Sequence, residues 1–480
     1  MTHESAKAER ILRRFARDTN LGIAGRHFIV TATETRKAEA DALRTLLSRL
    51  GALAVEGLSA ETVTVSLGDS DEIRLCTELF EGRGDANGRL DFATRHMPVT
   101  AAIGEELAAS NVVRGLRIGI AMMLEPKTAT LAMTLAAAGA DVAVYAHPDE
   151  TDDDVARALR GRGIPVDADT ALSGARERSA ALAFVERGFD VVIDDGSHLI
   201  RLAHESAPQL VRQWIGAAEE TTSGLTPLRL MEREGSLATP VIAVNDAATK
   251  TMFDNRYGTG QSCVFAIADV LDAVDIAVRD QPALVIGYGP VGQGVAAHLA
   301  ALGAEVSVAE SDPLRALLAS HDGFAVGTAE ALATGSLVVS ATGRAGTVTA
   351  TVLDSARIVA VAGGVPNEID LSRAMLTAVT PHIDATATGT LVLDKGGCIN
   401  ITAAEGNPIE IMDLSFATQL AAVSHLVTTR PGVGVHALPY PVVRHVAAVA
   451  AAARGLELEP SAHGDDAPGW HSTRYTRSDT

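Results

Sequence analysis

The sequence of 480 residues lacks several features that mark specialised classes of protein. Its three cysteines, Cys76, Cys263 and Cys398, are far apart and form no CxxC pair, so neither a zinc site nor a disulfide scaffold is predicted. The histidines show no ligand spacing, and we expect no metal ion. The absence of a GxSxG motif leaves a serine hydrolase without support.

Long apolar runs and an excess of positive charge are also lacking. No segment has about 18 uninterrupted apolar residues, and the N-terminus has no apolar signal core. The formal net charge of −20 argues against a nucleic-acid partner, because neutralising phosphates needs a basic surface. Aromatic residues make up only 4%, so alanine and valine carry the packing. We therefore expect a cytoplasmic enzyme with a small-molecule substrate and no membrane contact.

Short apolar segments alternate with helical patterns along most of the chain. Strand candidates such as DVAVYA, EVSVAES and RIVAVAGG are separated by helix candidates. This order predicts parallel, doubly wound sheets, in which ligands lie beyond the carboxyl ends of the strands. The first 85 or so residues predict a small α/β module. It contains two strands and, over 70–83, a short helix with Ser70 as its N-cap.

A glycine motif follows the strand candidate ALVIGYG. Gly287, Gly289 and Gly292 form GxGxxG between this strand and a helix, which is the arrangement of a dinucleotide loop. The next strand ends at Glu310, 23 residues after Gly287, where a carboxylate would bind a ribose diol. An acid at this place favours NAD over NADP. The alternative is a purely structural glycine turn.

These patterns predict an α/β fold with two doubly wound parallel-sheet domains, a substrate domain and a Rossmann NAD domain, plus the small N-terminal module. The predicted boundaries are 1–88 for the module, 89–255 for the substrate-binding domain, 256–413 for the NAD-binding domain, 414–455 for helices returning to the substrate domain, and 456–480 for a C-terminal tail.

The stretch 241–264 is unusually dense in polar residues between two apolar segments. It contains Asn245, Lys250, Asp254 and Asn255. A lysine, an aspartate and two asparagines beside a nicotinamide suit the oxidation of an alcohol. Two alternatives remain: a polar interdomain hinge with a solvated helix, and a surface ion pair between Lys250 and Asp254.

Two further carboxylates stand at the ends of apolar segments. Asp195 and Glu220 could each bind sugar hydroxyls. The alternative for each is a helix cap.

The motifs IDDG, AEETTSG, VNDAATKTMFDNRYG, VIGYGPVGQG, AESDP and GGCINITAAEGNP resemble those of S-adenosylhomocysteine hydrolases, in the order of that family. The resemblance covers roughly residues 89–460 and leaves the N-terminal module outside. It implies a recycled NAD that oxidises a ribose 3′-hydroxyl. The ketone then acidifies the C4′ proton, a 5′ thiol leaves, water adds, and the ketone is reduced.

The resemblance also implies a role for each motif residue. The implied catalytic residues are Lys250, Asp254, Asn255, Asp195 and Asn245. The implied substrate contacts are Glu220, Met123, Glu125, Lys127, Thr259, Asn407 and Met412. The implied cofactor contacts are Thr221, Thr222, Ser223, Gly287, Gly289, Pro290, Val291, Gly292, Glu310, Thr342, Gly343 and Asn400.

The departures from the family pattern lie mainly at the base and at the 5′ position. Met123 and Gly364 stand where the family has histidines, and Glu125 and Lys127 replace the Thr and Glu that recognise adenine. A lysine only donates hydrogen bonds, so it would suit a keto oxygen or an anion. The alternative for Lys127 is simple exposure at a helix start. The remaining departures are Thr259 for Cys, Asn407 for His, His198 for Asp, and a tail in which only HSTRYT resembles the family's Lys-rich end.

We therefore predict an adenosylhomocysteinase-like enzyme with NAD. Its substrate is a nucleoside or nucleoside thioether altered from S-adenosylhomocysteine, and the step after oxidation is elimination, addition or epimerisation. One alternative is an ordinary S-adenosylhomocysteine hydrolase. Another is a non-catalytic NAD-binding regulator, which the loss of two histidines favours. A homo-oligomer, tetramer or dimer, is expected from the resemblance.

Overall fold

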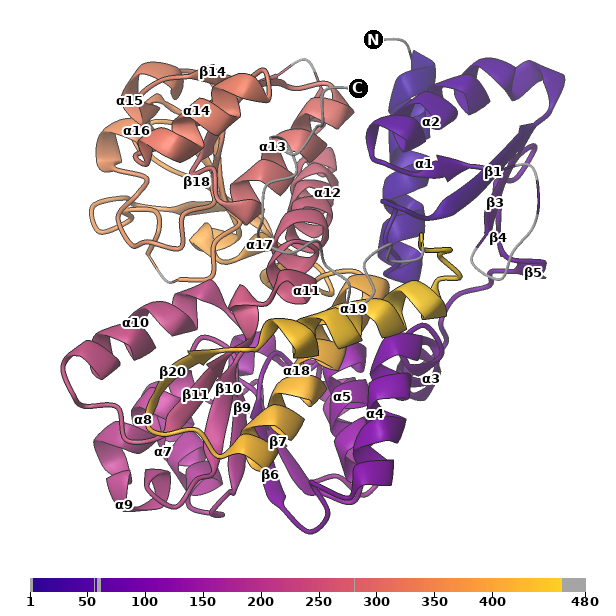
Figure 1. The fold of residues 1–480 in the computed structure, drawn as a ribbon. Coiled ribbons are helices and arrows are strands. Elements are labelled where there is room, and N and C mark those ends of the chain that lie inside the picture. Colours follow the sequence, from indigo (N-terminus) through magenta and orange to yellow (C-terminus); the bar gives the residue numbers. More distant parts are fainter. Residues whose placement is uncertain (1–2, 56, 58–61, 280, 366, 460–480) are drawn as a thin grey trace, which may run out of the picture.

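The computed structural model describes residues 3–55, 57, 62–279, 281–365 and 367–459. It contains three sheets, each with its own helices (Figure 1). Two of them are mainly parallel and doubly wound, which confirms the predicted α/β class. Residues 460–480 of the predicted tail, including HSTRYT, lie outside the described part.

The N-terminal module has a five-stranded sheet in the order β2-β1-β3-β4-β5. Its elements are α1 (His3–Thr19), β1 (His27–Ala32), α2 (Lys37–Arg49), β2 (Leu53–Ala54), β3 (Val63–Leu67), β4 (Glu72–Leu75) and β5 (Glu78–Leu79). The helix predicted over 70–83 is wrong, because this segment forms the β4–β5 hairpin. β4 pairs antiparallel with β3 and buries Ile73, so a partner strand overrides the local helical pattern.

The substrate sheet has seven parallel strands in the order β20-β11-β10-β9-β6-β7-β8. The strands are β6 (Arg117–Ala121), β7 (Asp141–Tyr145), β8 (Val166–Asp167), β9 (Val191–Asp194), β10 (Gly216–Glu219), β11 (Pro240–Ala243) and β20 (Gly434–Ala437). The helices are α3 (Ala86–Arg95), α4 (Pro98–Ser110), α5 (Pro126–Ala137), α6 (Asp153–Gly161), α7 (Gly174–Val185), α8 (His198–Ser206), α9 (Pro208–Val211), α10 (Thr222–Arg233), α18 (Ile409–Thr429) and α19 (Tyr440–Ala453). The order reverses between β6 and β9, which places a ligand crevice at their carboxyl ends.

The second large sheet has the order β14-β13-β12-β15-β16-β19-β18-β17. Its strands are β12 (Pro282–Ile286), β13 (Glu305–Ala309), β14 (Ala325–Val326), β15 (Leu337–Ser340), β16 (Ile358–Val361), β17 (Thr377–Thr380), β18 (Ile383–Ala385) and β19 (Leu391–Leu393). Its helices are α12 (Thr259–Asp272), α13 (Pro290–Leu302), α14 (Pro313–His321), α15 (Ala329–Leu332), α16 (Ala350–Ser355) and α17 (Ile399–Thr402). The order reverses between β12 and β15, so the loops after these strands flank a second crevice.

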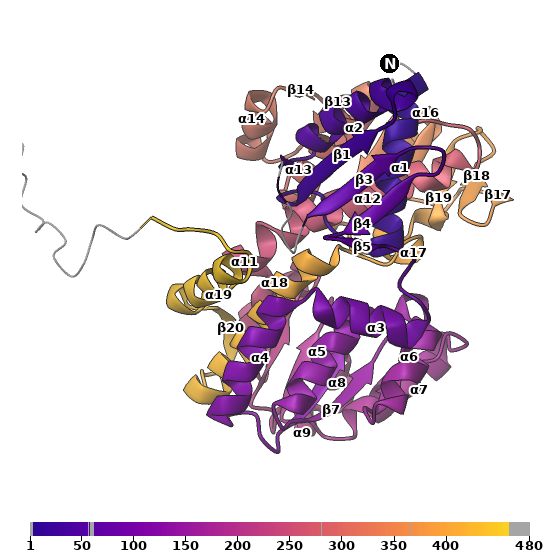
Figure 2. The same ribbon diagram turned by 90° about the vertical axis from the view of Figure 1, so that its right-hand side faces the viewer.

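The chain crosses between the two large sheets twice. The first crossing, 244–258, contains α11 (Ala248–Thr251) and a π-helical turn, η4 (Asp254–Gly258). The second crossing, 394–408, contains α17 and leads into the long helix α18. Figures 1 and 2 show the N-terminal module beside α12 and above α3, in the corner where the domains meet.

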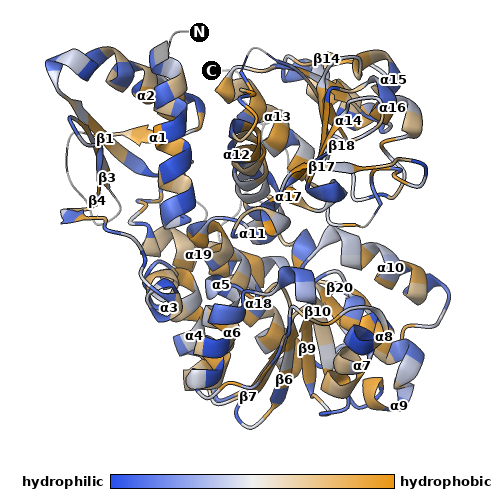
Figure 3. Cartoon of the chain, turned by 180° about the vertical axis from the view of Figure 1, so that it is seen from behind, coloured by the Kyte–Doolittle hydropathy of each residue, from blue (hydrophilic) through white to orange (hydrophobic). Residues whose placement is uncertain are grey.

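Packing unites the three parts of the chain. One hydrophobic cluster includes Phe15 and Leu21 of the module, Ile120 of the substrate sheet and Val264 of α12. In Figure 3 the apolar colour follows the strands of the substrate sheet, while many outer helices are polar on their exposed side. The module is therefore not a loose appendage, because its core is continuous with that of the rest of the chain.

Candidate active site

The glycine loop after β12 has the geometry of a dinucleotide cradle. Gly287 has a φ of 94°, and a Cβ on Gly292 would lie only 1.9 Å from the Gly287 carbonyl oxygen. Glycine is therefore required at both positions. Beside Gly289 the nearest group to a Cβ would be the Arg315 guanidinium, at 3.5 Å, so a cation borders the space next to the loop. Pro290 and Val291 begin α13, whose N–H groups point toward this loop.

Glu310 directly follows β13 and lies beside the same loop. Its carboxylate accepts hydrogen bonds from the backbone N–H groups of Tyr288 (2.7 Å), Ser311 (2.7 Å) and Asp312 (2.9 Å). Burial alone would raise its pKa, but these hydrogen bonds hold the pKa below its usual value. Glu310 is therefore ionised and able to accept bonds from a ribose diol.

The loop after β15 lies against the glycine loop. A Cβ on Gly287 would meet Thr342 at 3.0 Å. Behind Thr342 and Gly343 is the fully buried Glu368, which accepts bonds from the Thr342 hydroxyl and the Gly343 N–H, both at 3.1 Å. The two loops, the cation and the carboxylate together fit an NAD molecule.

The polar stretch of the first crossing forms a buried network. Lys250 Nζ lies 2.9 Å from Asp254 Oδ2 and donates to Asn255 Oδ1 at 2.9 Å. Asn255 Nδ2 donates to Asn245 Oδ1 at 3.0 Å. All four side chains are at most 8% exposed, so the solvated hinge and the surface ion pair are both excluded.

This network packs directly against the helix that follows the glycine loop. The π-helical turn η4 contacts α13, and a Cβ on Gly294 would lie 1.9 Å from the Arg256 carbonyl oxygen. π-Turns within helices are frequent at functional sites, because the extra residue redirects side chains. Here the turn carries Asp254 and Asn255 back to Lys250.

Glu220 borders the network at the end of β10. Its Oε1 lies 3.8 Å from Lys250 Nζ and has no hydrogen-bond partner among the described residues, while Oε2 accepts a bond from Gln419. Burial raises the pKa of Glu220 to about 8, against the opposing effect of Lys250. A buried acceptor without a partner is costly, so a ligand hydroxyl would stabilise it.

The charge on Lys250 is set by its neighbours. Burial disfavours the ammonium, but Asp254 and Glu220 outweigh burial and raise the pKa above the usual value. Lys250 is thus poised to stabilise an alkoxide through an N–H donor. To act as a base it must first pass a proton to a partner.

The helix-cap alternatives for Asp195 and Glu220 are wrong. The N-cap of α10 is Thr221, which accepts from Gly224 N–H, and the carboxylate that accepts from Ile200 N–H is Asp194. Asp195 is close to Lys250 and Thr221; burial raises its pKa, and Lys250 opposes that shift. Both residues therefore remain candidates for binding sugar hydroxyls.

Residues 219–223 form the turn between β10 and α10. The buried carboxylate of Glu219 accepts from the N–H groups of Gly196 (3.0 Å) and Ser197 (2.9 Å) and from the Thr221 hydroxyl (2.7 Å). Ser223 Oγ donates to Thr221 Oγ1 at 3.1 Å, whereas Thr222 is exposed. These hydrogen bonds hold the turn rigid where it faces the domain that contains the glycine loop.

Asn407 links the buried network around Lys250, the predicted sugar end of the site, to the second crossing. Its amide nitrogen donates to Asp254 and to Thr259 Oγ1 (3.1 Å), and its oxygen accepts from Ser262 (2.7 Å) and Asn400 (3.0 Å). The predicted cofactor contact Asn400 is thereby tied to the predicted catalytic group. Met412 is half-buried one turn into α18 and joins the hydrophobic cluster rather than this network.

The domains touch at two of the positions that lost a histidine. A Cβ on Gly364 would lie 3.4 Å from Ser223 Oγ, and a Cβ on Gly406 would lie 3.5 Å from Met123 Sδ. His198, which stands where the family has an aspartate, lies at the start of α8 beside His147, with the two rings 5.2 Å apart.

Glu150 was not found from the sequence. It follows β7, and its backbone carbonyl accepts from Leu124 N–H at 2.8 Å, directly beside Met123. Burial, with the charges of Asp195 and Asp149, raises its pKa to about 8. The only signal for it was an acidic residue after a strand, DVAVYAHPDE, which looked like the first turn of a helix.

The residues at the predicted base end of the site, Glu125 and Lys127, form a second buried polar cluster. Glu125 caps α5, accepting from the N–H groups of Lys127 (2.9 Å) and Thr128 (3.0 Å). Lys127 Nζ contacts Glu125 Oε2 (2.7 Å), Asn20 Oδ1 (3.0 Å) and the Glu405 carbonyl oxygen (2.9 Å). Lys127 is 1% exposed, so the alternative of simple surface exposure is wrong. Its three protons are all used within the chain, and a keto oxygen would have to displace one acceptor.

Among the described residues, no helix is both long and apolar enough to cross a membrane. In the same part of the chain, no group of three or more His, Cys, Asp and Glu side chains is arranged to hold a metal ion.

Comparison with known proteins points to one family. The family model "S-adenosyl-L-homocysteine hydrolase, NAD binding domain" matches residues 255–417. The S-inosyl-L-homocysteine hydrolase of Methanosarcina mazei is 38% identical over 387 residues, which are 78% of this chain and 93% of that protein. The adenosylhomocysteinase of Archaeoglobus fulgidus is 37% identical over 387 residues, covering 77% and 95%. This chain therefore belongs to the S-adenosyl-L-homocysteine hydrolase family, and its second large sheet is the NAD-binding domain.

Proposed function

We propose that this enzyme transiently oxidises the 3′-hydroxyl of a nucleoside thioether and then releases its 5′ thiol. The observation that carries the proposal is the buried Lys250–Asp254–Asn255–Asn245 network, packed against the helix of the NAD loop. NAD, when bound, supplies the oxidising equivalent and recovers it at the end of the cycle.

The chain's own residues hold the sugar and its protons. Lys250 would donate to the developing 3′-alkoxide, and Asp254 would take up the proton that Lys250 must release. Glu220, with its unpartnered Oε1, would accept a bond from a sugar hydroxyl. Asn245 and Asn255 fix the direction of the ammonium, so that it does not turn fully toward Asp254.

On the 5′ side we assign proton transfer to Glu150, since histidines are missing at 123 and 364. A carboxyl that stays protonated up to about pH 8 can protonate the departing sulfur as the C5′–S bond breaks. The resulting carboxylate can then accept a proton from the water that adds to C5′. The C4′ proton would pass to the Asp195 carboxylate, which lies near Lys250 and Glu150, before the elimination, and it would return from Asp195 to C4′ after the addition, so the cycle balances.

For the base, we propose a 6-oxo purine, as in S-inosyl-L-homocysteine. Replacing the family's glutamate by Lys127 removes an acceptor that an exocyclic amine would need. Relatives named for S-inosyl-L-homocysteine and for adenosylhomocysteine are about equally similar to this chain. The similarity alone therefore does not choose between the two bases, and the argument depends on the residue at 127.

The test is to mix purified protein that holds NAD with S-inosyl-L-homocysteine, S-adenosyl-L-homocysteine, inosine and adenosine. We expect the absorbance of NADH to appear and homocysteine to be released from the inosyl thioether, at a rate at least about tenfold above the adenosyl thioether. No NADH with any of the four compounds would overturn the oxidation. Faster release from the adenosyl thioether would favour the ordinary hydrolase.

A further inference from the structure

The N-terminal module lies outside residues 89–460, which resemble the family. It contacts the helices that follow the two connections between the domains. On α12, Gln261 exchanges hydrogen bonds with Ile23 N–H (2.9 Å) and the Leu21 carbonyl (3.1 Å). At the start of α18, Glu410 accepts from Gly22 N–H at 2.9 Å and pairs with Arg26. These contacts fall immediately after the first and second crossings, so the module touches both connections between the domains.

Charges reinforce this docking along α12. Arg13 is 3% exposed and binds Asp269 and, at 2.7 Å, Asp272. Arg279 binds the module's Glu9 at 2.6 Å. Because these are buried or half-buried ion pairs, removing one partner would leave the other charge without a partner in a poorly solvated place.

Asn20 connects the module to the base end of the site. It follows α1 and has a φ of 54°, a conformation that asparagine and glycine tolerate best. Its side-chain oxygen accepts from Lys127 Nζ at 3.0 Å, and its backbone carbonyl accepts from Ile409 N–H at 2.9 Å. Ile409 is two residues beyond Asn407, which binds Asp254. One residue of the module therefore contacts both Lys127 on α5 and the start of α18, directly after the second crossing.

Glu405 completes the junction from the second crossing. Its carboxylate binds Arg83 at 2.8 and 2.5 Å, while its backbone carbonyl accepts from Lys127. Burial would raise the pKa of Glu405, but Arg83, Lys127 and Arg89 hold the pKa below its usual value. The carboxylate is therefore ionised and keeps the loop fixed.

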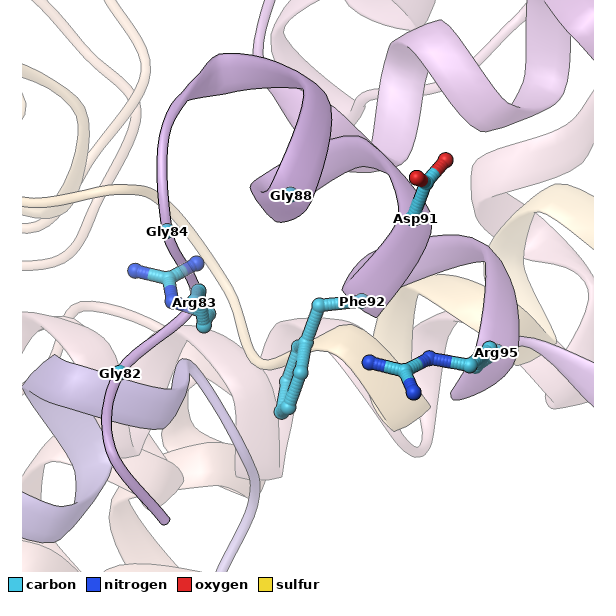
Figure 4. Close-up of a pocket in the computed structure, with 7 residues that line it drawn as sticks. All are labelled: Gly82, Arg83, Gly84, Gly88, Asp91, Phe92 and Arg95. Atoms are coloured by element: carbon cyan, nitrogen blue, oxygen red, sulfur yellow. The ribbon is translucent and has the colours of Figure 1, made fainter.

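Arg83 belongs to the linker between the module and α3. A surface pocket lies here, and Figure 4 shows the glycine-flanked Arg83 on one side of it with Phe92 and Arg95 of α3 on the other. None of its seven lining residues belongs to the sugar end or the glycine loop. The linker's role in the site is instead the bond from Arg83 to Glu405.

We propose that the N-terminal module is a working part of the substrate site, in which Asn20 is a positioning residue that sets Lys127 at the base end. This inference rests on the proposed function. Lys127 occupies the position of the residue that would recognise the base, and one of its three acceptors comes from the module. Without Asn20 the ammonium would be held by Glu125 and the Glu405 carbonyl alone, and it would turn toward them. The module thereby takes part in choosing the base, although it lies outside the family's own fold.

The test compares Asn20→Gly, Asn20→Asp and Asn111→Gly in the full chain with NAD. Glycine adopts the left-handed conformation of Asn20 without strain, so Asn20→Gly removes only the side chain. Asn111 is a matched control, because it has a φ of 57° but is exposed at the end of α4. KM, kcat, melting temperature and the dissociation constant of inosine and adenosine would be measured for each variant.

For Asn20→Gly we expect KM and the inosine dissociation constant to rise about tenfold, with kcat changed less than about threefold. In Asn20→Gly the preference between inosine and adenosine would shift, and the melting temperature would match that of Asn111→Gly. Asn20→Asp would restore the wild-type preference. An unchanged dissociation constant, or an equal loss for both nucleosides together with a lower melting temperature, would overturn the inference. If the wild type binds nucleosides but never forms NADH, the proposed function fails while the binding constants still decide the role of Asn20.

Discussion

The sugar end and the base end of the site are built in opposite ways. The sugar end takes Asn245, Lys250, Asp254 and Asn255 from one stretch of eleven residues. The base end takes Asn20, Glu125, Lys127 and Glu405 from three parts of the chain that are up to 385 residues apart. Both ends are buried, and both are centred on a lysine with several partners.

The difference shows where this chain kept its family's chemistry and where it changed. The oxidation of a sugar hydroxyl needs one compact group, and that group matches the family motif. The base end departs from the motif at 125 and 127, and there an added module supplies a partner. On the proposed function, the reaction is retained, while one residue that helps to choose the substrate comes from outside the region that resembles the family.

The largest expected effect is at the sugar end. Lys250→Met should lower the rate of NADH formation at least about 1,000-fold, because it removes both the donor to the alkoxide and the proton relay. Stopped-flow absorbance would measure this rate, with the exposed Lys37→Met as the control. NADH formation at the wild-type rate would remove the proposed role of Lys250. If Lys250→Met had no turnover but left the biological output of the protein unchanged, the alternative of a non-catalytic NAD-binding regulator would be favoured.

A smaller effect is expected from restoring the family residue at the base end. Lys127→Glu would set a carboxylate against Glu125 in a buried position, so we expect the free energy of unfolding to fall by about 3 kcal/mol. Urea unfolding would measure it, with the exposed Arg44→Glu as the control. If Lys127→Glu kept wild-type stability and gained activity on S-adenosyl-L-homocysteine, the base end would work independently of the module.

The smallest effect on turnover is expected from Glu220→Gln. With a pKa of about 8 the carboxyl is mostly protonated at pH 7, and glutamine resembles that form, so turnover at pH 7 should change less than about threefold.

The same variant carries a pH signature. Because the pKa of Glu220 is raised from 4.5 to about 8 on folding, its contribution to stability is fully present below pH 4.5 and is lost as pH rises to about 8. Unfolding measured across this range should show the wild type losing stability relative to Glu220→Gln. A pH-independent difference between the two proteins would show that Glu220 is not the titrating group.

Much of the fold was predictable because its signals are local. Buried parallel strands need continuous apolar runs, and GxGxxG between a strand and a helix is the arrangement of a dinucleotide loop. The 70–83 segment was misread because four residues of helix-compatible pattern became a strand only when β3 offered hydrogen bonds. Glu150 was missed for a related reason, since its proposed role depends on the neighbouring ends of β6 and β9 and not on its own sequence.

By itself, the sequence determined the two doubly wound sheets, the NAD loop and the polar residues that form the sugar end, because each depends on residues a few positions apart. Only the tertiary structure decided which residues come together at the base end. Sequence spacing could not show that Lys127 is buried, that Glu125 caps its helix, or that Asn20 reaches both. These facts follow from how the module packs into the corner between the domains, where burial forces each polar group to find a partner from another part of the chain.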